Sequence, residues 1–111
     1  MLRQVVTALL HDGCTEVWAD LPGYRAPALQ LNDLADGTAS DVIAHKDGLL
    51  LFAVETRDTI GTPYTLQKWR CLSSYASRSG ALFCIVIPAG SLRRTEGILK
   101  SNGIEAELLQ I

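Results

Sequence analysis

The chain has 111 residues, of which 48% are hydrophobic and 20% charged, and its formal charge is −2 at pH 7. This length predicts one domain over residues 1–111 that buries enough apolar surface to fold without disulfides or metal. The slight negative charge argues against a strongly basic nucleic-acid-binding protein. Residues 57–111 nevertheless hold seven basic and four acidic side chains, so an anionic partner would prefer this half of the chain.

The three cysteines, Cys14, Cys71 and Cys84, are far apart and lie in apolar runs. No Cys-x-x-Cys pair exists and the cysteines are odd in number, so a zinc site is not expected. Buried free thiols in a reducing, cytoplasmic compartment are predicted instead. The longest apolar run, residues 49–54, is too short to cross a membrane, and no membrane partner is expected.

Apolar residues recur at helical spacing over residues 2–11, which predicts a first helix that ends near Asp12-Gly13. Residues 14–20 predict a strand, in which Cys14, Glu16 and Trp18 alternate with Thr15 and Val17. Residues 21–40 contain two prolines and two glycines. They predict a long connection with a short helical turn at 29–34, and a connection of this length is typically functional or mobile.

Two further strands are predicted at residues 41–45 and 49–56, joined by a turn at Lys46-Asp47-Gly48. The run 49–54 is apolar on both faces. Such a strand is typical of the middle of a sheet that is covered on both sides, so two layers of helices are expected.

The second helix is predicted over residues 63–79. Thr62 suits its N-cap, Pro63 its first turn, and Gly80 the position after its end. Its predicted buried stripe consists of Leu66, Trp69, Leu72 and Ala76.

An apolar strand is predicted at residues 82–87, followed by a third helix that Ser91 can cap and that runs to about Ser101. Asn102-Gly103 would end this helix. Residues 104–111 alternate as a half-buried edge strand does. The predicted fold class is therefore α/β, in the order α-β-β-β-α-β-α-β.

The hairpin register decides whether the acidic residues Asp41 and Glu55 can meet. A two-residue turn at Asp47-Gly48 would put them on opposite faces of the sheet, because side chains alternate along a strand. A three-residue loop at Lys46-Asp47-Gly48, with Gly48 left-handed, shifts the register by one. This loop is predicted, and it places Asp41, Glu55 and Arg57 on one face.

The order of these features resembles the PD-(D/E)XK nuclease superfamily. An acidic residue lies on one central strand, the next strand is an apolar run that ends in an acidic-x-basic triplet, and a helix follows. Here the matching residues are Asp41 and Glu55-Thr56-Arg57. The order of elements is similar to that of archaeal Holliday junction resolvases and related restriction-type nucleases. The resemblance covers nearly the whole chain and implies a restriction endonuclease-like, three-layer domain with a central mixed sheet.

The resemblance also implies a chemistry. Asp41 and Glu55 would hold Mg²⁺ or Mn²⁺, with the Thr56 carbonyl as an extra oxygen ligand. Such a metal polarises a phosphodiester and helps to generate hydroxide from water. A lysine beside the metal usually orients the water and stabilises developing negative charge.

The chain departs from this family pattern at the lysine. Arg57 stands in its place; arginine can hold a phosphate or pair with Glu55, but it does not act as a base. Lys68 on the second helix is the candidate for a relocated lysine, and Lys46 is a weaker one. Ser40 replaces the family's proline, and Gln4 stands where relatives often carry a glutamate on the first helix.

Candidate DNA-binding side chains are Arg25, Lys46, Lys68 and Arg70, although exposed basic residues are commonly only solvated. A homodimer would suit a nuclease that cuts two strands. Three hypotheses stay open: a metal-dependent DNA endonuclease, a catalytically inactive nuclease-fold module for binding or assembly, and a small α/β protein without a nuclease link. The last would hold if Asp41 and Glu55 pointed to opposite faces.

Overall fold

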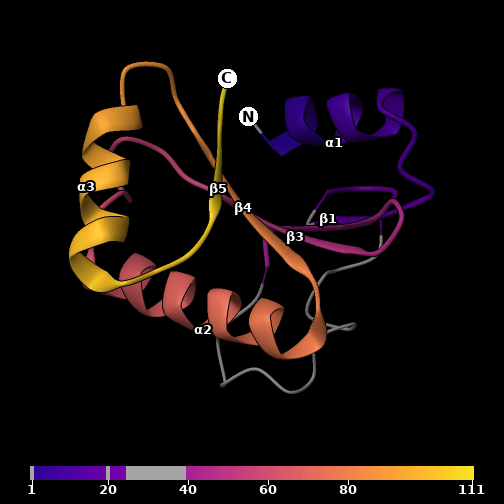
Figure 1. The fold of residues 1–111 in the computed structure, drawn as a ribbon. Helices are drawn as coiled ribbons and strands as arrows, with labels where there is room; N and C mark the ends of the chain where they lie inside the picture. Colours follow the sequence, from indigo (N-terminus) through magenta and orange to yellow (C-terminus); the bar gives the residue numbers. More distant parts are fainter. Residues whose placement is uncertain (1, 20, 25–39) are drawn as a thin grey trace.

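The structure is a computed structural model that describes residues 2–19, 21–24 and 40–111. In chain order its elements are α1 (Leu2–His11), β1 (Glu16–Ala19), β2 (Val42–His45), β3 (Leu49–Val54), α2 (Pro63–Ser79), β4 (Leu82–Ile87), α3 (Leu92–Asn102) and β5 (Glu107–Gln110). The described strands form one mixed sheet in the order β1-β2-β3-β4-β5. Helix α1 lies on one side of this sheet, and α2 and α3 lie on the other (Figure 1).

The predicted α/β class and order of elements are confirmed. Strands β1, β2 and β3 are antiparallel neighbours, whereas β3, β4 and β5 run parallel. Strand β4 has the predicted bounds, whereas the other four strands are shorter than predicted; pairing continues past β2 and β3. The Asp41 N–H donates to Phe52 O at 2.9 Å, and the Glu55 N–H donates to Val86 O at 2.9 Å. The predicted helical turn at 29–34 lies outside the described residues.

The predicted three-residue hairpin loop is confirmed. His45 pairs with Leu49, which leaves residues 46–48 as the loop. Gly48 has the positive φ that was predicted for it (138°), and Asp47 has a positive φ as well (54°), which was not predicted. The register carried one residue further sets Asp41 opposite Ala53, and Asp41 therefore faces the same side as Glu55.

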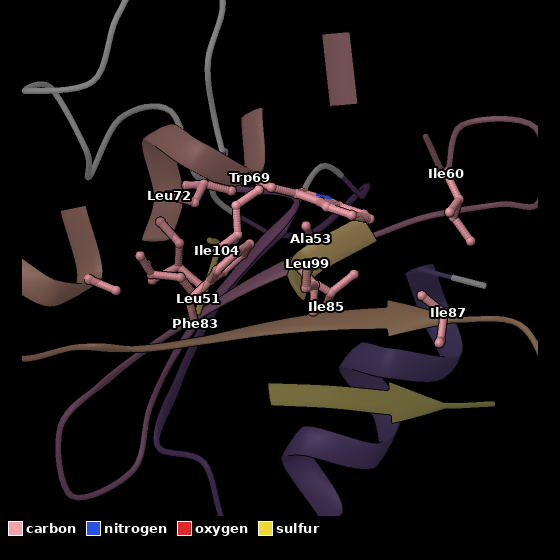
Figure 2. Packing of buried hydrophobic residues seen from close by; sticks show 12 residues of the cluster. Leu51, Ala53, Ile60, Trp69, Leu72, Phe83, Ile85, Ile87, Leu99 and Ile104 are labelled. Carbon is pink, nitrogen blue, oxygen red and sulfur yellow. The ribbon is translucent and has the colours of Figure 1, made fainter. Parts of the chain in front are cut away.

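The sheet buries apolar side chains on both faces, as the sequence of β3 predicts. Leu51 and Ala53 belong to the core under α2 and α3, while Phe52 belongs to the core under α1. Figure 2 shows the first of these cores, with the Trp69 ring lying over Ala53. Glu55 continues the Leu51–Ala53 alternation, which directs its side chain toward the α2 side.

Helix α2 has the ends that the sequence predicts. The Thr62 hydroxyl accepts a hydrogen bond from the Thr65 N–H at 3.2 Å, Pro63 starts the helix, and Gly80 ends it at φ 71°. Trp69, Leu72 and Ala76 are buried as predicted, whereas Leu66 is half-buried. Two polar residues, Thr65 and Lys68, are buried on the same helix.

Helix α3 also follows its prediction, with Gly103 left-handed after its last residue. Ser91 precedes the helix but makes no side-chain capping bond. Cys14 and Cys84 are buried and Cys71 is half-buried, and all three are free thiols. In the described part of the chain, no helix combines the length and hydropathy that a bilayer crossing requires.

Candidate functional site

The Glu55 carboxylate is buried at the end of β3 and is held by side chains from two other segments. Only 2% of the residue is exposed. Lys68 Nζ lies 2.8 Å from Oε2, and the Trp69 indole N–H donates to the same oxygen at 3.0 Å. The Thr59 hydroxyl donates to Oε1 at 2.9 Å. A buried carboxylate with three donors is fixed in one orientation.

Asp41 lies beside the Glu55 carboxylate, at the residue before β2. Its Oδ2 accepts the Val54 N–H at 2.7 Å and lies 3.3 Å from Lys68 Nζ. Its side chain is 35% exposed, so this carboxylate is the part of the cluster that solvent reaches. Burial raises the pKa of the Asp41 carboxyl, and the Lys68 ammonium and the Val54 N–H offset only part of that rise.

Lys68 joins the two carboxylates from α2. Its side chain is only 10% exposed. Burial lowers the pKa of this ammonium, but the attraction of Asp41 and Glu55 outweighs burial, so the pKa lies above its ordinary value. Lys68 is therefore a positive charge at neutral pH.

The Arg57 side chain contacts a different part of the molecule from Lys68. Strand β3 ends at Val54, so side-chain alternation no longer fixes the direction of Arg57. Its guanidinium donates to the Ala89 carbonyl at 3.3 Å, beyond the end of β4. Among the described residues Arg57 forms no ion pair with Glu55, and the cation at the two carboxylates is Lys68.

The Thr56 carbonyl, predicted as a further metal ligand, takes part in a tight turn. It accepts the N–H groups of Thr59 and Ile60, each at 3.2 Å, and the Thr59 hydroxyl lies 3.1 Å away. Arg94 from α3 braces this turn by donating to Ile60 O at 2.8 Å. The backbone oxygen of Thr56 is thus already satisfied within the turn.

The remaining predicted basic residues are placed away from the carboxylates or are not described. Lys46 Nζ pairs with Asp12 at 3.0 Å, near the hairpin loop. Arg70 donates to the Asn102 side chain at 2.7 Å. Gln4 is exposed on α1, which covers the opposite face of the sheet. Arg25 lies outside the described residues.

Trp69 and Thr59 are the members of the cluster that the sequence did not indicate as site residues. Trp69 was predicted to be a core residue, which is confirmed, but its N–H also serves Glu55. A signal for this was present, because a buried Trp needs a partner for its indole N–H. Thr59 follows Glu55 by four residues in an irregular stretch, where no periodicity points to a contact.

The cluster offers two protein ligands to a metal. Among residues 2–19, 21–24 and 40–111, no group of three or more His, Cys, Asp and Glu side chains could hold an ion. Magnesium sites often use only one or two carboxylates and complete the shell with water and substrate phosphate oxygens. Asp41 and Glu55 already share one cation, the Lys68 ammonium. Asp41 and Glu55 supply carboxylate oxygens, which are the type of ligand that a hard divalent cation takes.

Comparisons with models of protein families, with curated proteins and with solved structures found no match to this chain. The physical basis for a function is therefore the chain's own cluster. It consists of two carboxylates and a lysine on one side of a mixed sheet, with Asp41 open to solvent.

Proposed function

We propose that the chain is a metal-dependent DNA endonuclease-like domain of the PD-(D/E)XK type, with a restriction endonuclease-like fold, that hydrolyses phosphodiester bonds. The observation that carries the proposal is the contact of one ammonium, Lys68 Nζ, with both Asp41 and Glu55. Two acidic residues from neighbouring strands and a lysine are the groups that this chemistry requires.

Asp41 and Glu55 are the proposed ligands of Mg²⁺ or Mn²⁺, which when bound supplies a Lewis acid for the phosphodiester. Trp69 and Thr59 keep the Glu55 carboxylate in place through their hydrogen bonds. Asp41 is the exposed ligand, so a phosphate group would approach from its side. The Thr56 carbonyl would join the ligands only after leaving its turn.

Lys68 is the proposed lysine of the site. Its ammonium lies at both carboxylates, whereas the Arg57 guanidinium lies on the Ala89 carbonyl. A lysine in this place can donate to a phosphate oxygen and stabilise the charge that develops on it. Arg57 is proposed as a phosphate contact, since arginine keeps its charge and matches phosphate geometry.

A second candidate, a catalytically inactive nuclease-fold module for binding or assembly, is favoured by a different observation. Lys68 already neutralises part of the charge of both carboxylates, and the Thr56 carbonyl is satisfied in its turn. Under this proposal the cluster is a structural ion-pair network. A DNA partner through Arg25, Lys46 or Arg70, and a homodimer, stay predictions under both candidates.

The test is cleavage of supercoiled plasmid and of branched DNA in Mg²⁺ or Mn²⁺, with chelator as a control. The wild type is expected to cut, and Asp41→Asn and Glu55→Gln are expected to lose at least about a hundredfold in rate, since a metal contributes several kcal/mol to catalysis. Lys68→Met should lose activity, while Lys100→Met, at an exposed lysine of α3, should keep it.

Two results would count against the proposal. Absence of cleavage by the wild type in either metal, together with no metal binding by calorimetry, would leave the inactive module as the better account. Cleavage gained only by Arg57→Lys would show that the working lysine position is residue 57 and not residue 68.

A further inference from the structure

We infer that the Lys68 ammonium stands in for the divalent metal at Asp41 and Glu55, and that metal binding displaces it toward the substrate side of the site. This inference rests on the proposed function. It adds a second role for Lys68: the ammonium occupies the metal position while no metal is bound and, once displaced, faces the phosphodiester.

The first argument is position. Lys68 Nζ lies 2.8 Å from Glu55 Oε2 and 3.3 Å from Asp41 Oδ2. A metal held by these same two oxygens would need the space that the ammonium occupies. Such a metal and Lys68 in its present conformation would therefore exclude one another.

The second argument is charge. Two ionised carboxylates and one ammonium leave the cluster with a single negative charge. A divalent cation added beside Lys68 would turn this into a positive charge in a place where Glu55 is 2% exposed, and uncompensated buried charge is costly. Exchange of the ammonium for the metal leaves the cluster neutral, so exchange is favoured over addition.

The third argument is the asymmetry of the surroundings. Glu55 keeps hydrogen bonds from Trp69 and Thr59 when Lys68 leaves, so its carboxylate is not orphaned. Asp41 is the exposed side of the cluster. A lysine has a flexible four-carbon stem and can move its charged end toward water while the stem stays packed. The displaced ammonium would then lie where a phosphate group approaches.

The test measures Mn²⁺ affinity by calorimetry for the wild type, Lys68→Met, the control Lys100→Met and the ligand variant Glu55→Gln. Lys68→Met is expected to bind Mn²⁺ at least about tenfold more tightly than the wild type, because no ammonium has to be displaced. Lys100→Met should match the wild type, and Glu55→Gln should lose binding. Thermal melting with and without Mn²⁺ shows that each variant is folded and gives a second measure of binding.

A second measurement needs no variant. The side-chain ammonium resonance of Lys68 in the ¹⁵N-labelled wild type should be protected from solvent exchange without metal and should lose that protection when Mg²⁺ is added. Lys100 provides the internal reference, since it is exposed in either state.

The outcomes separate this inference from the proposed function. Equal or weaker Mn²⁺ binding by Lys68→Met, or an unchanged Lys68 resonance in metal-bound wild type, overturns the exchange and leaves the nuclease proposal standing. Binding by Lys68→Met alone overturns the displacement of Lys68 in the wild type, because the ammonium then blocks the metal, and it identifies the wild type as an inactive module. Absence of binding in both proteins overturns the metal site and the exchange together.

Discussion

At the scale of single residues, the geometry of the cluster depends on how Glu55 is held. A carboxylate that is 2% exposed is stable only with charge and hydrogen-bond partners, and here these come from Lys68, Trp69 and Thr59. The Trp69 N–H and the Lys68 ammonium share one oxygen. If either donor is lost, this buried oxygen keeps only one of its two partners, and the free energy of unfolding falls.

Trp69→Phe tests this dependence. The substitution keeps an aromatic ring but removes the donor to Glu55 Oε2, and a buried acceptor deprived of a partner costs about 1–3 kcal/mol. Urea denaturation should therefore show a free energy of unfolding that is lower by at least that amount, because the smaller ring also leaves a cavity. A double-mutant cycle with Glu55→Met, which removes the acceptor, should give a coupling energy. Additive effects of the two substitutions would argue against the hydrogen bond.

The residues of the site differ in how far sequence could place them. Asp41 and Glu55 were predicted to share a face, since alternation along two paired strands and the loop length determine it, and the register is confirmed. Lys68 was only a candidate, because its burial arises from the packing of α2 on the sheet and not from local spacing. Arg57 was predicted to share a face with Glu55 because side chains alternate along a strand. It lies after the end of β3, in a turn, where this alternation does not apply.

At the scale of the elements, local signals placed the helices and the hairpin, and pairing between strands set the strand ends. Thr62, Pro63 and Gly80 mark the ends of α2 in sequence and in structure. The ends of the strands depend less on local sequence, because a residue belongs to a strand only where a residue of a neighbouring strand pairs with it. This is why β1 starts at Glu16 and β5 at Glu107, later than alternation alone predicted.

Two glycines give opposite predictions for the helices. Gly80 ends α2 at φ 71°, so Gly80→Ala should lower the free energy of unfolding by about 1 kcal/mol, since a Cβ is strained there. Gly97 lies inside α3 and an added Cβ would meet nothing within 4 Å. Gly97→Ala should therefore raise the free energy of unfolding by about 0.5–1 kcal/mol. Chemical denaturation of both variants checks the pair, and a change of the same sign in both would contradict it.

At the scale of the whole molecule, the sheet separates two cores. Cys84 belongs to the core under α1, on the face opposite Asp41 and Glu55. The parallel strands β3 and β4 end on one edge of the sheet, and the turn after β3 contacts α3 there through Arg94. Ligands of open α/β sheets typically bind beyond the carboxyl ends of such strands. The position of Glu55 after β3 agrees with that tendency.

The burial of Cys84 predicts a dependence of stability on pH. Burial, and to a smaller extent Glu107, raise the pKa of this thiol to about 11 from 9.0. The unfolded chain therefore releases the proton at lower pH than the folded one, so the free energy of unfolding falls as pH rises from 9 to 11, by about 2 kcal/mol. Cys84→Ala should lack this part of the fall. Denaturation of both proteins at pH 8.5 and pH 11 checks this prediction. An equal fall in the free energy of unfolding of the two proteins would contradict the role of Cys84.

The metal site at Asp41 and Glu55 is tested most directly by a crystal structure of the wild type soaked in Mn²⁺, with the ion located by its anomalous scattering. We predict one ion in contact with carboxylate oxygens of both Asp41 and Glu55, and Lys68 Nζ moved away from its present place 2.8 Å from Glu55 Oε2. An unchanged Lys68–Glu55 ion pair with no anomalous peak at the two carboxylates, at a Mn²⁺ concentration that saturates known magnesium enzymes, would rule out both the metal site and the displacement of Lys68.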